Sequence, residues 1–281
     1  FSLNTRNIST KDFSWTTSIN LGLNTNKILN ETVAENATYP AREGYPVGAI
    51  FAYKTAGLDA DGYPLFLAED GTKQTAAEFF SLNRFGASTL TAEQQRSLYS
   101  YMGTEEPKVS GGFINTFEWG DWQLNMNWMF NLGMKVRVQP SYSPTYFDRG
   151  LNTNHDILHR WVADGTAGND GSSAAYPILM TSTPERASEY THFSEYQTYS
   201  MLDVWVRKRN YCRLQSLRLG YRIPQKVLTP IGISSASLSL EARNLFVIAS
   251  NYDNYLDPET MGNPYAQPIP KSFIFGLNVT F

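Results

Sequence analysis

The sequence predicts an all-β fold, and three observations support this prediction. Charged residues make up 17% of the chain, below the roughly 25% of an average soluble domain, while aromatic residues reach 14%. Several segments alternate strictly between apolar and polar residues, which is the period of a β-strand. No segment approaches the ~20 continuous apolar residues of a membrane helix. Together these features predict amphipathic strands that form the wall of a transmembrane antiparallel β-barrel.

The clearest alternation runs from Asp121 to Val138. Its even positions, beginning at Trp122, are all apolar, whereas the odd positions between them are mostly Gln, Asn, Gly, Lys and Arg. We therefore expect one long strand across the whole segment. Five further strands and the tail of a seventh are expected from similar patterns, at residues 13–24, 112–119, 217–223, 235–243, 272–281 and 1–9.

Short and long connections alternate along the chain. Gly120-Asp121 and the segment from Pro224 to Ile233 are short and carry turn residues. The other connections are long, at residues 30–108, 139–211 and 251–270. Loops of this size are uncommon in a compact soluble domain, but a membrane barrel has short turns on one side and long loops on the other.

The predicted topology places a set of aromatic residues at the short-turn end of the strands. Such residues settle at the level of the lipid headgroups, so they predict a girdle around the barrel. The alternative is a soluble β-sandwich with an aromatic core, although sandwich strands usually have about 5 or 6 residues. Because the smallest membrane barrels need about eight strands, we expect this chain to be part of a larger wall. The girdle residues are Phe13, Trp15, Phe117, Trp119, Trp122, Tyr221 and Phe281.

Several functional classes receive no support from the sequence. The net charge of -3 argues against a nucleic-acid partner, and the basic triplet 207–209 is expected to be solvated or at headgroup level. The single cysteine, Cys212, excludes an internal disulfide framework. His155 and His159 lack defined further ligands, so we expect no metal or cofactor. The sequence contains no nucleophile motif such as Gly-x-Ser-x-Gly, and we expect no enzyme activity. Since the chain starts without Met or an apolar leader, any signal peptide is expected upstream of it or to have been cleaved.

Several ordered motifs resemble one family, the SusC/RagA-like TonB-dependent outer-membrane transporters, in their C-terminal portion. The first is the Glu-Gly-x-Pro-x-Gly loop in "REGYPVGAIFAYKTAGLDADGYPLF". The second is the strand in "VRKRNYCRLQSLRLGYRIPQ". The third and fourth are the Arg-Asn-Leu-Phe and Asp-Pro-Glu elements in "LSLEARNLFVIASNYDNYLDPE" and the ending "YAQPIPKSFIFGLNVTF".

This resemblance implies that residues 1–281 form the C-terminal part of a 22-stranded barrel whose plug domain lies outside the sequence. It implies a bacterial outer-membrane importer that works with a SusD-like surface lipoprotein, contacts membrane lipid, and receives energy from the TonB complex through the missing N-terminal part. It also implies that Phe281 is the signal read by the barrel-assembly machinery, although the same residue can serve as a girdle aromatic.

The resemblance favours import of oligosaccharides, with oligopeptides as the alternative within the family. Outside the family, the alternative is a surface β-sandwich that binds glycans. Aromatic rings can stack on sugars, and charged residues on the lumen-facing side of the strands can contact a substrate. The same charges could instead pair with one another, and the loop tyrosines could simply pack the loops. The expected contact residues are Arg218, Arg222, Glu241, Arg243, Trp161, Tyr45, Tyr53, Tyr63 and Tyr255.

Overall fold

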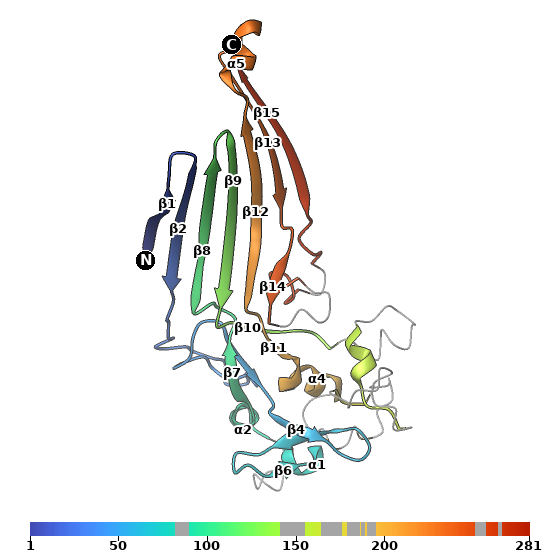
Figure 1. Ribbon diagram of the computed structural model, residues 1–281. Coiled ribbons are helices and arrows are strands. Elements are labelled where there is room, and N and C mark those ends of the chain that lie inside the picture. The colour runs from blue at the N-terminus through green and yellow to red at the C-terminus, as the bar shows by residue number, and fades with distance from the viewer. Residues whose placement is uncertain are drawn as a thin grey trace.

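The computed structural model describes residues 1–81, 90–140, 155–163, 176–178, 186, 189, 195–250, 257–263 and 266–281. Its main element is one antiparallel sheet of eight strands in the order β1-β2-β8-β9-β12-β13-β15, with β14 also paired to β12 (Figure 1). A strand forms at each of the seven predicted positions, although the one predicted over residues 121–138 is shorter than expected. Their bounds, with β14, are β1 (Ser2–Ser9), β2 (Phe13–Leu23), β8 (Val109–Trp119), β9 (Trp122–Leu132), β12 (Tyr211–Arg222), β13 (Ser235–Arg243), β14 (Val247–Ala249) and β15 (Ser272–Thr280).

The sheet is open, because its order ends at β1 on one side and at β15 on the other. A closed barrel is therefore not formed by the described residues alone. No second sheet covers the apolar face in the described part of the chain, since Phe275 is 72% exposed and Trp119 is 70% exposed. A β-sandwich would bury these side chains between two sheets. This single layer does not fit the sandwich alternative.

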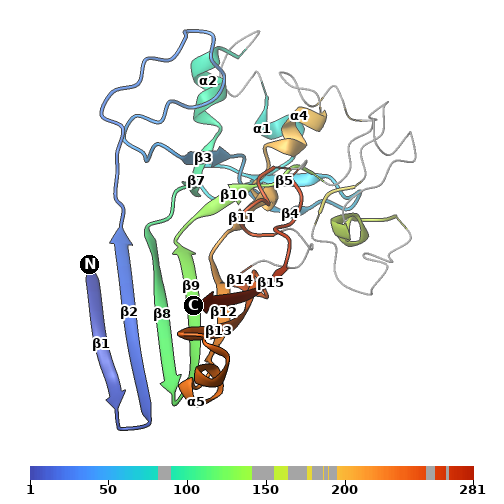
Figure 2. The same ribbon diagram turned by 90° about the horizontal axis from the view of Figure 1, so that it is seen from above.

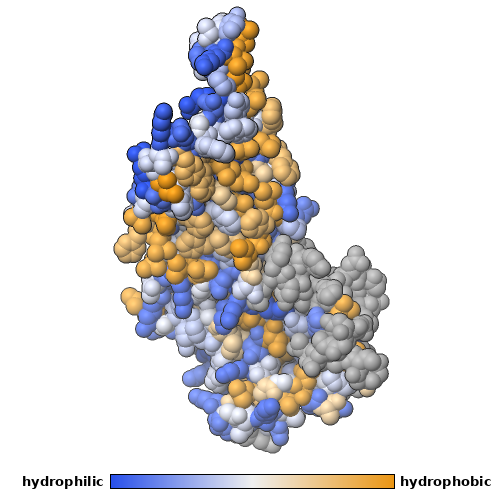
Figure 3. Space-filling view, viewed as in Figure 1, coloured by the Kyte–Doolittle hydropathy of each residue, from blue (hydrophilic) through white to orange (hydrophobic). Residues whose placement is uncertain are grey.

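Strand register brings the apolar positions to one face of the sheet. Trp15 pairs with Phe117 and their rings stack at 5.6 Å, while Trp122 pairs with Tyr221 at 4.5 Å between ring centroids. Such cross-strand aromatic pairs stabilise a sheet by about 0.2–1 kcal/mol each. Figure 3 shows the resulting apolar band across the long strands, with hydrophilic residues towards both ends.

Three polar residues, Asn7, Thr17 and Asn115, interrupt this apolar face, and their side chains form hydrogen bonds with one another. Thr17 donates a hydrogen bond to Asn115 Oδ1 at 2.7 Å, and the Trp15 indole donates to the same oxygen at 3.0 Å. Asn7 donates to the Thr17 hydroxyl at 2.6 Å. The polar atoms are therefore paired across β1, β2 and β8, which lowers the cost of placing them among apolar side chains.

The strand predicted from Asp121 to Val138 is too long, and this is a correction. β9 ends at Leu132, and Gly133 has φ of +80°, a conformation that favours glycine. The chain then forms β10 (Lys135–Arg137), which pairs with β11 (Val206–Lys208) in a separate sheet. Val136 is 2% exposed there, within the core of the loops. The alternation continues past Leu132 because the apolar residues there, such as Val136, pack into the protein core of the loops. The apolar residues of β9 instead lie on the open face of the sheet.

The long connections fold into a separate body at one end of the sheet (Figure 1). Its buried core includes Tyr53, Phe66 and Trp205, each 0% exposed. Capping boxes start its first two helices, with the Thr75 hydroxyl accepting from the backbone of Glu78 in one of them. Its elements are β3 (Ala49–Ala52), β4 (Thr55–Leu58), β5 (Pro64–Leu67), β6 (Lys73–Gln74), α1 (Ala76–Phe79), α2 (Ala92–Ser97), β7 (Ser100–Thr104), η2 (His155–His159), α4 (Glu195–Ser200) and η4 (Asp203–Trp205).

The short connections lie at the opposite end. Gly120 has φ of +54° in the tight turn between β8 and β9. The connection between β12 and β13 contains α5 (Gln225–Leu228) and η5 (Thr229–Ile231), and the C-terminus lies beside it (Figure 1). The turned view in Figure 2 shows the same separation, with the loop body at one end of a curved sheet. The predicted alternation of turns and loops is confirmed.

Candidate functional site

The predicted lumen-facing charges share one face of the sheet. The antiparallel register of β12 and β13 places Arg218 opposite Glu241 and Arg222 opposite Ser237. Leu217 and Leu219 point to the other face because successive side chains of a strand alternate. The polar face therefore collects the charges that the sequence pattern assigned to it.

The cross-strand ion pair that the sequence allowed is not formed. Glu241 instead accepts a hydrogen bond from Arg243 Nε at 2.6 Å, two residues along the same strand. This pair is partly exposed, so it stabilises the protein by about 1 kcal/mol or less. Within the described residues, neither Arg218 nor Arg222 has a carboxylate within ion-pair distance. These two cations remain available to a ligand or another protein segment.

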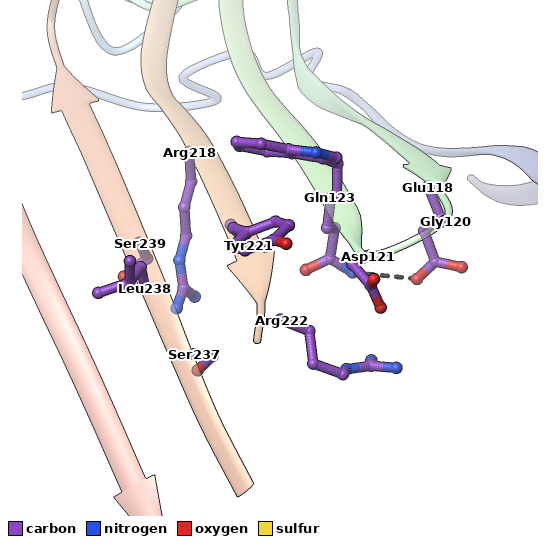
Figure 4. A pocket seen from close by; sticks show the side chains of 12 residues that line it. Glu118, Gly120, Asp121, Gln123, Arg218, Tyr221, Arg222, Ser237, Leu238 and Ser239 are labelled. Carbon is purple, nitrogen blue, oxygen red and sulfur yellow. Dashed lines mark hydrogen bonds between the residues drawn. The ribbon is translucent and has the colours of Figure 1, made fainter. Parts of the chain in front are cut away.

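A pocket lies between these two arginines (Figure 4). Gly220 stands between them on β12 and lines the pocket, and a Cβ added there would meet its nearest atom at 3.8 Å. Glu118 lines the pocket and accepts hydrogen bonds from Gln123 and Ser14, both at 3.1 Å. The site offers guanidinium, carboxylate and amide groups in one place. Its remaining polar lining residues are Asp121, Ser237 and Ser239.

Tyr53 was expected to contact substrate, but the structure buries it completely. Its ring is 0% exposed and stacks on Tyr99 with 4.3 Å between centroids. Burial raises the pKa of Tyr53 well above its ordinary value, with a smaller contribution from Tyr99, so the phenol stays neutral. Tyr53 packs the loop core and presents no ring surface to a cargo.

The other expected aromatic residues occupy different positions. Tyr45 is 37% exposed and packs against Tyr101 at 4.8 Å. Tyr63 is buried, and the Arg186 guanidinium lies 4.3 Å from its ring centroid. Trp161 lies against Gly62, where any Cβ would clash with the indole. Tyr255 lies outside the described residues.

Trp161 also lines a second pocket in the loop body. The walls of this pocket are mainly apolar and include Leu58, Leu202 and Val204. Asp59 is its one acidic group, and this carboxylate accepts a hydrogen bond from Arg186 at 2.7 Å. The pocket therefore offers an indole and aliphatic surface, with its charge already neutralised. Substrate contact by Trp161 and Tyr45 stays a prediction.

A buried ion cluster was missed by the sequence reasoning. Arg213 on β12 is 3% exposed and binds Asp257 at 2.5 Å and Glu259 through its Nε. Its partners come from the third long loop, in the Asp-Pro-Glu element. Both segments carry motifs that are visible in the sequence, but no local signal links residues so far apart. The cluster fixes this loop against the polar face of the sheet.

Phe281 is 88% exposed and lies at the short-turn end of β15. Its role as an assembly signal stays a prediction. Among the described residues, no group of three His, Cys, Asp or Glu side chains is placed to hold a metal ion. No helix in the described part of the chain is long and apolar enough to cross a membrane.

Comparisons with known proteins place this geometry in context. No family model matches the chain. Among curated proteins of Formosa agariphila, TonB-dependent receptor P3 is 23% identical over all of this chain and 28% of its own length. TonB-dependent receptor P26 is 24% identical over all of this chain and 28% of its own length. The chain thus spans less than a third of the relatives that it matches.

The chain is also similar in fold to solved structures of a transporter. A structure of the RagAB peptide transporter matches with a TM-score of 0.67 and 21% identity, covering all of this chain and 28% of that chain. The RagAB peptide importer in its closed-closed state matches with a TM-score of 0.68 and 22% identity, covering all of this chain and 29% of that chain. These proteins are receptors and transporters, not enzymes, in keeping with the expectation from the sequence. The ordered motifs, the strand order and these likenesses show that the chain is similar to a portion of the SusC/RagA-like TonB-dependent transporters.

Proposed function

We propose that this chain forms part of the wall of a TonB-dependent importer in the bacterial outer membrane. The observation that carries the proposal is a single sheet whose apolar face has exposed side chains on every strand from β1 to β15 of the sheet order, among them Leu3, Leu219 and Phe275. In the whole protein, 22 strands and a plug would close this wall, as the family resemblance implies. Closure would pair the free edges of β1 and β15 and leave the polar face inside.

The dimensions of the sheet support this proposal. β2, β8 and β9 each contain 11 residues. At about 3.3 Å per residue and a tilt of about 40°, such strands rise roughly 28 Å, close to the ~25 Å apolar band of an outer-membrane barrel. The aromatic pairs at the short-turn end would then lie at the headgroup level of the periplasmic side. The loop body would face the outside of the cell.

The cargo proposed for this importer is a nutrient oligomer. An oligosaccharide is supported by Trp161 in its apolar pocket, because an indole can stack on the apolar face of a sugar. An oligopeptide is supported by the likeness to RagAB, which is a peptide importer. Partners are inferred from the family: a SusD-like lipoprotein that covers the loop side, and the TonB complex acting on a plug outside this sequence.

Uptake by cells tests the proposed function. Fluorescent oligosaccharide and oligopeptide mixtures would be given to cells that carry the full-length protein with its surface lipoprotein, and the same strain without TonB would be the control. We expect accumulation of one mixture in the periplasm that disappears when TonB is removed. Accumulation that is unchanged without TonB would contradict active import and favour an open pore.

A further inference from the structure

A third pocket lies where the three long loops meet. Glu105 comes from the loop between β2 and β8, Arg137 and Arg209 come from the loop between β9 and β12, and Glu259 comes from the loop before β15. The pocket has a volume of about 380 Å³, within the range of small-molecule sites. Its wall therefore combines two basic and two acidic side chains from segments far apart in the sequence.

Two of these four side chains already have partners. Arg137 donates hydrogen bonds to the backbone oxygens of Ser200, at 3.0 Å, and Phe51. Glu259 accepts from Arg213 in the buried ion cluster. These contacts hold the loops together, so Arg137 and Glu259 form the frame of the pocket.

The other two side chains are unpaired. Arg209 is partly buried, and its Nε is a buried donor without a hydrogen-bond acceptor. Glu105 is exposed at the pocket. Within the described residues, neither forms an ion pair, and the two groups are not within 4 Å of one another. The Nη1 end of this guanidinium lies near Gly262 in the pocket wall, and a cation without a carboxylate partner favours a bound anion.

Gly262 allows the third loop to close the pocket. A Cβ at this position would come within 2.8 Å of Val136 Cγ2 and 4.0 Å of Arg209 Nη1. The glycine backbone thus lies against β10 and leaves room beside the guanidinium. The basic triplet 207–209 was expected to be solvated or at headgroup level, but Arg209 lines this pocket within the loops.

We propose that this pocket is a peptide subsite in which Arg209 binds a carboxylate and Glu105 binds an ammonium group of the cargo. The inference rests on the proposed import function and names its substrate class. A zwitterionic peptide supplies both charges at separate points, whereas a neutral oligosaccharide supplies only hydroxyl groups and leaves both pocket charges uncompensated.

Binding to the purified full-length transporter tests this subsite. The probe is a random tripeptide library with uncharged side chains, prepared with free ends, with amidated C-termini, and with acetylated N-termini; peptides of this length suit a pocket of about 380 Å³. Retained peptides are quantified by mass spectrometry. We expect the library with free ends to be retained about tenfold better than either blocked form, since each blocked end loses one charge-assisted contact.

Matched variants test which pocket residue binds the carboxylate of the peptide and which binds its ammonium group. Arg209→Gln should abolish the preference for a free carboxylate and keep the preference for a free amine, and Glu105→Gln should do the reverse. Lys208→Gln, at an exposed position beside Arg209, should change neither preference. Heat-modifiable migration of each variant on gels would verify folding.

Equal retention of the three libraries, no retention of any of them, or a preference that survives Arg209→Gln would overturn the subsite. Retention of a neutral maltodextrin mixture in place of the libraries would also overturn the subsite. TonB-dependent uptake of that mixture would still support the import function. Loss of TonB-dependent uptake for every cargo would instead overturn the import function itself.

Discussion

The apolar face of the sheet can be tested by placing a charge at different heights along one strand. β9 runs from Trp122 to Leu132, so its middle residue is Asn127. Each residue raises the strand by about 3.3 Å along its axis, or roughly 2.5 Å along the membrane normal at a tilt of about 40°. Met126 would thus lie about 3 Å from the centre of the bilayer, and Leu132 about 13 Å from it.

These heights give different costs for the same substitution. An arginine on the lipid face costs about 2–4 kcal/mol at the midplane and about 0–1 kcal/mol near the interface. We therefore expect about 2–4 kcal/mol for Met126→Arg, about 0–1 kcal/mol for Leu132→Arg, and an intermediate value for Phe130→Arg. Asn127→Arg is the matched control, because its side chain points to the polar face and should be tolerated.

The measurement is reversible unfolding of the full-length protein in phospholipid vesicles by a denaturant, followed by tryptophan fluorescence. Heat-modifiable migration on gels would report assembly in cells. The decisive result is the fall in cost from Met126→Arg through Phe130→Arg to Leu132→Arg, together with the tolerance of Asn127→Arg. Equal costs for Met126→Arg and Asn127→Arg would refute a lipid-facing side.

Three further perturbations follow from the packing. Arg213→Ala leaves the buried Asp257 carboxylate without its cation and should cost about 3–5 kcal/mol, with faster hydrogen exchange in residues 257–263 as the readout. Gly111→Ala should lower the unfolding midpoint more than Gly276→Ala does, because the first Cβ would meet the backbone oxygen of Asn20 at 2.3 Å and the second the movable hydroxyl of Ser239. Because burial raises the pKa of Tyr53, the loop core should keep its stability below pH ~10 and lose it at higher pH, where unfolding releases a proton; tyrosinate absorbance would follow the transition.

The strands of the sheet could be predicted because their sequence pattern is local. A period of two reports both the strand and its two faces, so the opposition of Arg218 to Glu241 follows once β12 and β13 are paired. The end of β9 could not be predicted in the same way. Met134 and Val136 continue the apolar phase, but they lie at 3% and 2% exposure in the loop core. Alternation reveals which side chains avoid water and does not reveal what covers them.

The site residues were predictable only in part, for a related reason. Aromatic residues in a loop can stack on a sugar or pack on one another, and composition does not separate these uses. The ring of Tyr53 stacks on Tyr99, whereas Trp161 keeps an open pocket beside it. Arg213 and Arg209 are equally basic in the sequence, yet one is fully paired and the other is not. Such differences depend on which distant segments meet.

Topology explains why distant segments meet at all. Every second connection is short, so each long connection must leave the sheet from the same end. Neighbouring strands lie only about 4.8 Å apart, so the loops that leave them are crowded together and must pack. The alternation of turns and loops therefore requires a shared loop body, in which residues as far apart as Glu105 and Glu259 line one pocket. A cargo subsite at that junction contacts all three loops, so a change in any loop alters binding without altering the wall.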